Sequence, residues 1–188
     1  SQEHLRAFLP WATGYSAETA DGYLDRAREG LRTHRDFSYR VADGDTGELL
    51  GSAGLMARIG PRALEIGYWV RADRTREGIA TRAAAALTRA ALDLPDVDRV
   101  EIHHDAANQA SAGVPRRLGY TRAGEYRRDV RPYVTACVVG DGWFHQLTRR
   151  RSPIRAILRS VGDGRHVVGR AGDLARIAEL LDRALDDE

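Results

Sequence analysis

The sequence predicts a mixed α/β domain in which a largely antiparallel sheet is flanked by helices. Strand-like runs come before and between segments of helical periodicity, and the first two strands are joined by a turn-rich segment typical of a hairpin. The 188 residues, 43% of them hydrophobic, are enough for one core with a short appendage. No window approaches the ~18 apolar residues of a membrane helix, so we expect no membrane partner.

The first elements are a helix and a hairpin. Apolar residues recur at helical spacing from Ser16 to Leu31, and Ser16 is suited to cap that helix. Residues 37–41 alternate as a strand, turn residues follow at 43–47, and residues 49–56 form an apolar second strand. The acidic turn also resembles a calcium loop, but it lacks the downstream glutamate at the required spacing, so a plain hairpin is favoured.

Strand, turn and helix then follow one another twice. Residues 63–70 form a β-rich run, and residues 78–94 an alanine-rich helix. Residues 99–105 predict a short strand, and residues 108–118 a short helix that ends at Gly119. Two or three further strands are expected at 121–129, 133–139 and 143–147.

Charge and cysteine content restrict the function and the compartment. The 29 basic and 27 acidic residues give a net charge of only +2, which does not favour a nucleic-acid partner, and the arginines at 149–151 are interpreted as a solvated loop. Because Cys137 is the single cysteine, we expect no internal disulfide and a reducing, cytoplasmic compartment. No group of histidine, cysteine and acidic residues has metal-ligand spacing, so we expect no metal.

The segment 68–81 carries the strongest functional signal, because a strand there ends in an arginine-rich turn and a helix opens at Gly78. The amides and dipole of a helix N-terminus bind anions, and glycine lets a phosphate approach the backbone. Neither the Walker nor the Rossmann pattern is present. From spacing alone, a diphosphate held by main-chain amides and an ordinary helix start beside solvated arginines both remain open.

Two segments together point to a family. EIGYWVRADRTREGIAT (65–81) followed by DAANQASAGVPRRLGY (105–120) resembles the acetyl-coenzyme A site of the GCN5-related N-acetyltransferases (GNAT), especially the RimJ/RimL-like branch. The family's turn of the form Gln/Arg-x-x-Gly-x-Gly/Ala grips the diphosphate, and residues 75–80 match it except for Thr75 at the first position. The resemblance covers roughly residues 1–128. It implies a GNAT-like acyl-CoA N-acyltransferase fold and transfer of acetyl from acetyl-CoA to a primary amine by direct attack.

The resemblance also implies the cofactor site. The strand at 66–70 would diverge from the strand at 100–104, so that the pantetheine arm lies between them. Asn108 would meet that arm and Ser111 would bond the sulfur as the thiolate leaves, which places both in the catalytic set; Asn108 also suits a helix cap. The expected cofactor-binding residues are Trp69, Val70, Arg71, Arg76, Glu77, Gly78, Ile79, Ala80, Thr81, Asn108 and Ser111.

An acceptor amine must lose its proton before it attacks. Glu65 lies where RimJ/RimL-like proteins resemble one another in carrying a glutamate, and it is the expected catalytic base, acting through water. His103 and His104 are rivals by chemistry, but alternation sends them to opposite faces of a strand, so at most one faces the cleft. The backbone N-H of Val70 is expected to stabilise the tetrahedral intermediate.

The acceptor is less well specified than the donor. The resemblance favours a protein N-terminal α-amine, as in ribosomal proteins, over a small amine or an aminoglycoside. Trp11, Tyr15 and Tyr68 are expected to line its site. A non-catalytic acyl-CoA-binding module is the alternative of another class, and it is supported by Thr75 and by the unusual order of segments.

That order departs from the family. We expect residues 1–148 to form the acetyltransferase body without its usual first strand and helix, residues 149–164 to form a bridge, and residues 165–188 to resemble the missing element. A circular permutation would explain this order, as would a swap that completes a neighbouring subunit of a homodimer. A truncated second domain and an unrelated amphipathic helix stay open.

Overall fold

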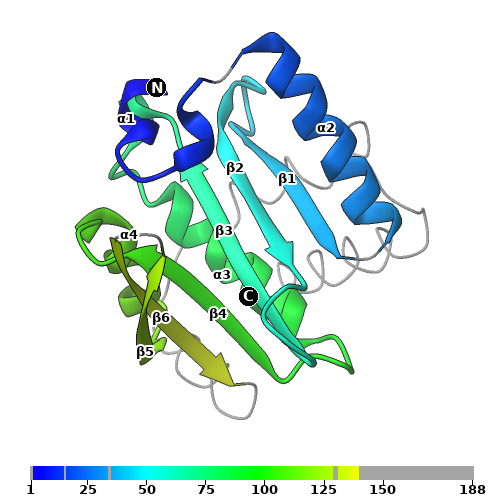
Figure 1. Ribbon diagram of the computed structural model, residues 1–188, viewed down its shortest axis with the longest axis vertical. Helices are drawn as coiled ribbons and strands as arrows, with labels where there is room; N and C mark the ends of the chain where they lie inside the picture. Colours follow the sequence, from blue (N-terminus) through cyan, green and yellow to red (C-terminus); the bar gives the residue numbers. More distant parts are fainter. Residues whose placement is uncertain (1, 15, 34, 129–130, 140–188) are drawn as a thin grey trace.

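The computed structural model of the chain describes residues 2–14, 16–33, 35–128 and 131–139 (Figure 1). Its strands form a six-stranded sheet in the order β1-β2-β3-β4-β6-β5. The elements are α1 (Gln2–Arg6), η1 (Pro10–Ala12), α2 (Ala17–Arg32), β1 (Asp36–Ala42), β2 (Leu49–Met56), β3 (Ala63–Val70), η2 (Ala72–Arg74), α3 (Ile79–Leu92), β4 (Arg99–Asp105), α4 (Gln109–Arg117), β5 (Thr121–Arg128) and β6 (Arg131–Val139).

The pairing of the strands confirms a mixed and largely antiparallel sheet. Four neighbouring pairs are antiparallel, and only β3 with β4 is parallel. The expected strand at 143–147 and the segments at 149–164 and 165–188 lie outside the described residues, so the permuted or swapped arrangement stays a prediction. No helix in the described part of the chain is long and apolar enough to cross a membrane.

Helix α3 covers one face of the sheet and forms the core with it. The side chains of Leu55, Ile66 and Ile102 are only about one per cent exposed, and the alanines of α3 let the helix approach them closely. Figure 1 shows α3 behind the sheet, while α1 and η1 lie near the end to which β3 runs. The one buried hydroxyl on this helix, that of Thr88, lies 2.7 Å from the Tyr120 hydroxyl and so has a polar partner. Helix α3 is therefore held against the sheet by a packed core.

Helices α2, α3 and α4 begin where the sequence predicts. Ser16 caps α2 and its side chain accepts the backbone N-H of Thr19. Gly78 and Asn108 are the residues that cap α3 and α4. Both segments that were expected to bind the cofactor therefore open helices.

Strands β3 and β4 pair over only part of their length. The parallel ladder joins Ala63–Ile66 to Arg99–Ile102 and goes no further, although both strands continue. Figure 1 shows the two strands diverging toward the end of the sheet near α4. The divergence that the family resemblance implies is therefore present.

The described part of the chain ends with the hairpin β5–β6. Strand β6 lies between β4 and β5, and every residue of β5 is exposed. The sequence predicts both strands but not this order, in which the later strand is the one that joins the sheet. The hairpin therefore extends the sheet beyond β4, because β6 pairs along the whole length of β4.

Candidate functional site

The turn between β3 and α3 exposes the main-chain amides of the helix start. Gly78 has φ of +76° and gives the helix no side-chain cap, and Arg76 has φ of +68°. Two left-handed residues on either side of Glu77 shape a concave turn, in which successive N-H groups bind anions well. The amides of Ile79, Ala80 and Thr81 open the first turn of the helix at this point. The geometry is that of an anion site.

A further arginine lies at the same helix start. The Nη1 of Arg82 is 3.1 Å from the position that a Cβ on Gly78 would take, and its Nε is buried without a hydrogen-bond partner in the described part of the chain. An arginine beside a helix N-terminus is disfavoured by the helix dipole unless an anion joins it. The sequence analysis missed Arg82, which lies one turn beyond Gly78. A diphosphate fits this set of donors.

Arg76 carries a strained backbone, which makes a test possible. A non-glycine residue in the left-handed region costs on the order of 1 kcal/mol, so Arg76→Gly should raise the free energy of unfolding by about that amount. Urea denaturation measures the change. Arg76→Ala is the matched control, because it removes the same charge and keeps the Cβ. Equal stability of the two variants would contradict the strain.

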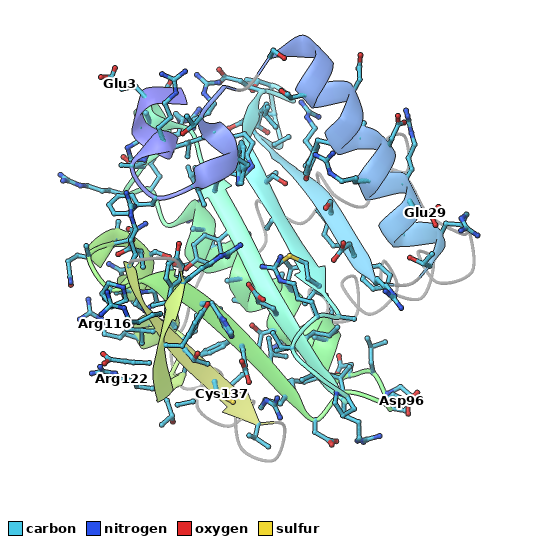
Figure 2. All side chains as sticks on the ribbon, in the orientation of Figure 1. Glu3, Glu29, Asp96, Arg116, Arg122 and Cys137 are labelled. Carbon is cyan, nitrogen blue, oxygen red and sulfur yellow. The ribbon has the colours of Figure 1, made fainter. Side chains whose placement is uncertain are left out.

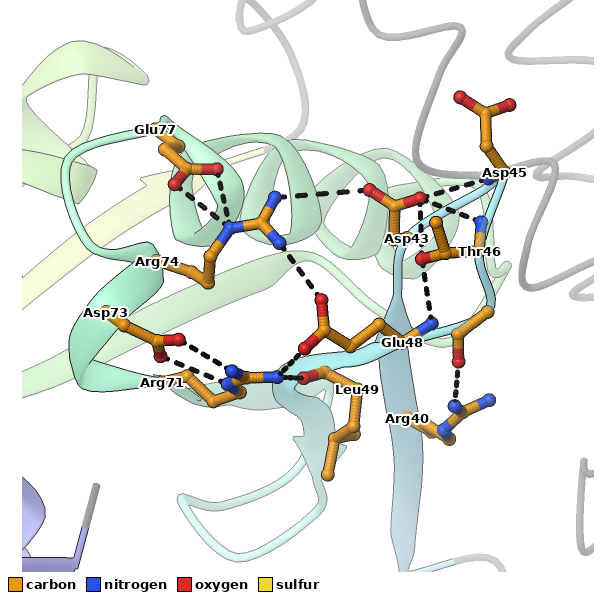
Figure 3. A network of polar contacts seen from close by, with 11 residues as sticks. Arg40, Asp43, Asp45, Thr46, Glu48, Leu49, Arg71, Asp73, Arg74 and Glu77 are labelled. Carbon is orange, nitrogen blue, oxygen red and sulfur yellow. Dashed lines mark hydrogen bonds and ion pairs between the residues drawn. The ribbon is translucent and has the colours of Figure 1, made fainter.

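The other arginines of the turn are held by acidic side chains (Figure 3). Arg71 bonds the carboxylates of Asp73, at 2.6 Å, and Glu48, and these bonds raise the pKa of Arg71. Arg74 bonds Glu77 at 3.0 Å and Glu48 at 3.3 Å. Glu48 therefore ties the turn of the β1–β2 hairpin to the turn after β3, and it neutralises Arg71, an expected cofactor-binding residue, together with Arg74.

The backbone of β3 presents free groups to the gap between β3 and β4. The N-H of Arg71 donates to the carbonyl of Leu50 on β2, and hydrogen bonds in an antiparallel pair involve every second residue. The N-H of Trp69 therefore points toward β2, whereas the N-H groups of Tyr68 and Val70 point toward β4. Since the parallel ladder has ended at Ile66, these groups face the gap.

The start of α4 meets the end of β3 across that gap. Asn108 accepts the N-H of Ser111 at 3.0 Å, which is the expected cap. The hydroxyls of Ser111 and Tyr68 are 3.1 Å apart, and burial raises the pKa of Tyr68 to about 12. Tyr68 thus lies beside Ser111 and against the core, on the face of the sheet opposite to the expected base Glu65.

Glu65 lies on the other face and is tied to an arginine. Its side chain is 9% exposed, and its two oxygens accept from Arg58 Nε at 2.7 Å and Arg58 Nη2 at 2.6 Å. These bonds raise the pKa of Arg58. On this face Trp11 also approaches Trp69, with ring centroids 6.4 Å apart, so an expected acceptor residue meets an expected cofactor residue. Tyr15 lies outside the described residues.

Next to Glu65, a histidine is held between two polar partners. Nε2 of His103 is 2.7 Å from a Glu101 oxygen, and its Nδ1 is 3.0 Å from the Tyr126 hydroxyl. His104 is buried on the opposite face, where its Nδ1 is 3.0 Å from the Asp105 carbonyl oxygen. The sequence analysis missed Glu101 and Tyr126. The signal for Glu101 is its spacing of two from His103 on a strand, which places both on one face.

Cys137 on β6 lies opposite Glu101 in the sheet register (Figure 2). Burial, and then the charge of Glu101, raise the pKa of its thiol. The thiolate fraction at pH 8 is therefore lower than in a free cysteine, and iodoacetamide should alkylate the folded protein several-fold more slowly than it alkylates a cysteine peptide. Mass spectrometry follows the reaction. Alkylation as fast as in the peptide would contradict the burial.

No group of three or more histidine, cysteine, aspartate or glutamate residues in the described ranges could hold a metal ion. The site therefore consists of four parts that surround the gap. They are the uncapped start of α3, the free backbone edge of β3, the Tyr68–Ser111 pair, and the ionisable cluster of Glu65, Glu101, His103 and Tyr126 on the opposite face.

Known proteins share this fold. RimL, the ribosomal L7/L12 α-N-protein acetyltransferase in complex with coenzyme A, matches with a TM-score of 0.66 and 22% identity over 74% of this chain and 82% of that one. RimJ of Mycobacterium smegmatis, in complex with CoA-disulfide, matches with a TM-score of 0.66 and 22% identity over 79% of this chain and 78% of that one. At these identities the likeness shows the fold.

Sequence comparison gives the family. YdaF of Bacillus subtilis (strain 168), which carries the name of a ribosomal N-acetyltransferase, is 35% identical over 66 residues. That match covers 35% of this chain and only 36% of the relative's length. The model of the acetyltransferase (GNAT) domain matches residues 1–121, which is well over half of the chain. The resemblance seen in the sequence is confirmed, and the chain belongs to the GNAT family of acetyltransferases.

Proposed function

We propose that the protein transfers the acetyl group of acetyl-CoA to a protein N-terminal α-amine by direct attack. The observation that carries the proposal is the gap between β3 and β4, with the uncapped start of α3 at one side and Ser111 at the other. A thioester arm in that gap would meet the free N-H groups of β3. The names of the similar ribosomal-protein acetyltransferases support an N-terminal amine as acceptor.

Each part of the site has a role in this reaction. The amides of α3 and Arg82 hold the diphosphate, and the N-H of Val70 stabilises negative charge on the carbonyl oxygen in the transition state. The Ser111 hydroxyl, oriented by Tyr68, donates to the sulfur as the C-S bond breaks. Trp11 and Trp69 form an apolar wall for the acceptor on the opposite face of the sheet.

Release of free coenzyme A tests the proposal. The protein is incubated with acetyl-CoA and with a panel of peptides with free N-termini, the same peptides with blocked N-termini, small diamines and an aminoglycoside. We expect thiol release only with free N-terminal peptides. Release with the diamines or the aminoglycoside instead would overturn the acceptor class. Binding of acetyl-CoA without release of free coenzyme A in the presence of any of these amines would indicate a non-catalytic acyl-CoA-binding module.

The acidic network beside the diphosphate gives a prediction on affinity. Glu48→Gln removes the carboxylate that Arg71 and Arg74 share, so that their charges can face the diphosphate. The dissociation constant of coenzyme A should fall about threefold at low salt. Calorimetry measures it, and Asp45→Asn in the same exposed turn is the matched control for net charge. Weaker binding by Glu48→Gln would contradict the prediction.

A further inference from the structure

Glu65 is poorly arranged to accept a proton. Both of its oxygens already accept hydrogen bonds from the guanidinium of Arg58. Taking up a proton at either oxygen would break that bidentate pair. A different group on the same face is therefore needed to receive the proton of the acceptor amine.

The bonds of His103 define which of its nitrogens is free to act as a base. Glu101 accepts from Arg99 Nε at 2.6 Å through one oxygen and lies 2.7 Å from His103 Nε2 through the other. An ionised carboxylate can only accept, so Nε2 carries the hydrogen and Nδ1 carries the lone pair. That lone pair accepts the hydroxyl of Tyr126 at 3.0 Å. The assignment of the tautomer follows from this network.

The position of His103 along the strand fits the chemistry. The parallel ladder ends at Ile102, so His103 is the first residue of β4 beside the gap in which the thioester would lie. The ring of Tyr126 contacts His103 edge-on, with centroids 5.5 Å apart, and Tyr126 is 37% exposed, so an acceptor can reach its hydroxyl. Burial and the charge of Glu65 raise the pKa of Tyr126, which keeps that hydroxyl protonated near neutral pH.

We propose that His103, held between Glu101 and Tyr126, takes the proton of the acceptor amine and that the Tyr126 hydroxyl relays it. The proposal rests on the proposed function. The ammonium gives a proton to the Tyr126 oxygen while the Tyr126 hydroxyl gives its own to Nδ1 of His103. The imidazolium that forms beside Glu101 later releases this proton to water.

The remaining steps balance the reaction. The freed lone pair of the amine forms the C-N bond at the thioester carbonyl, and the C-S bond then breaks with its electron pair going to sulfur. Collapse of the tetrahedral intermediate removes a second proton from nitrogen. The departing thiolate takes up this second proton, and the hydrogen bond from Ser111 assists its departure. The products are the acetylated amine, coenzyme A and one proton in water.

Several ionisable groups surround His103. Arg99 and Glu101 are on its own strand, Tyr126 and Arg128 are on β5, and Tyr133 and Cys137 are on β6. From the side of β3 come Glu65 and its partner Arg58. Because several of these groups can ionise, the acid limb of the pH-rate profile is assigned by comparing His103→Gln with Glu65→Gln, and not from the shape of the profile alone.

The test compares three variants with the wild type, using a free N-terminal peptide as acceptor. His103→Gln should lower kcat about 100-fold and remove the acid limb of the pH-rate profile. Tyr126→Phe should lower kcat about tenfold, because water replaces the relay less well. Glu65→Gln should keep the acid limb. The exposed His4→Gln is the control, and the dissociation constant of coenzyme A shows that each variant is folded.

Chemical rescue separates proton transfer from structure. His103→Ala leaves a space beside Glu101, and added imidazole should raise the rate of this variant at least tenfold. Loss of the acid limb in Glu65→Gln, with the limb retained in His103→Gln, would overturn the proposal and leave the proposed function intact. A wild type that acetylates no amine would overturn both.

Discussion

Replacing Ser111 with alanine should lower kcat for acetyl transfer about 100-fold, which is the lower end of what a positioned proton donor contributes. The Ser111 hydroxyl lies at the start of α4, facing the gap, and is oriented by the Tyr68 hydroxyl at 3.1 Å. Without it the departing thiolate has no donor. The dissociation constant of coenzyme A should stay within about twofold, because the amides of α3 still hold the diphosphate. Stopped-flow thiol detection and calorimetry measure the two quantities.

Two further variants make this result specific. Tyr68→Phe keeps the ring in the core but removes the partner of Ser111, and it should cost an intermediate amount of rate, about tenfold. Ser52→Ala removes a hydroxyl that donates to the Tyr39 carbonyl at 2.9 Å, away from the gap, and it should leave kcat unchanged. If Ser111→Ala kept the full rate, the leaving group would need another donor.

Replacing Gly51 with alanine should lower the free energy of unfolding by about 3 kcal/mol, the upper end of the usual range for overpacking. A Cβ on Gly51 would overlap the carbonyl oxygen of Trp69, which belongs to the backbone of the adjoining strand and cannot move aside alone. Gly51 pairs with Val70 in the β2–β3 ladder, at the end that leads into the turn between β3 and α3. Coenzyme A binding should therefore weaken as well.

Gly67→Ala is the matched control for that substitution. It lies in the same sheet, but its Cβ would meet only the terminal methyl of Met56, at 2.9 Å, and that flexible side chain can turn away. We expect a cost below about 1 kcal/mol. Urea denaturation of both variants gives the comparison. Equal destabilisation would show that the close approach of β2 and β3 is not the reason why position 51 excludes a side chain.

Local patterns in the sequence were sufficient for most elements of the fold. The alternation through Val100 and Ile102 predicts β4 with its observed bounds, and Gly78 and Asn108 lie at the helix starts that were expected of them. These features depend on neighbours within a few residues, and for that reason one chain is enough to read them. The family followed from two such segments.

Contacts between distant segments could not be predicted in the same way. Arg58 and Glu65 meet because a turn brings the end of β2 close to β3. Tyr126 on β5 contacts His103 on β4 across β6, which lies between these two strands. Strand order and side-chain partners are decided by packing across the whole sheet. The pairing of Glu48 with Arg71 and Arg74 has the same origin, because it joins the turn between β1 and β2 to the turn after β3.

In the proposed reaction, acetyl-CoA and the acceptor amine meet different kinds of binding surface. The donor half of the site is built on α3 and β3, whose side chains pack into the core, whereas β5 is exposed along its whole length and its backbone pairs only with β6. Substitutions on β5 at positions other than Tyr126 can therefore change the surface near His103 with little loss of stability. Under the proposed function, related enzymes can therefore differ in the amine that they acetylate while their affinity for acetyl-CoA stays the same.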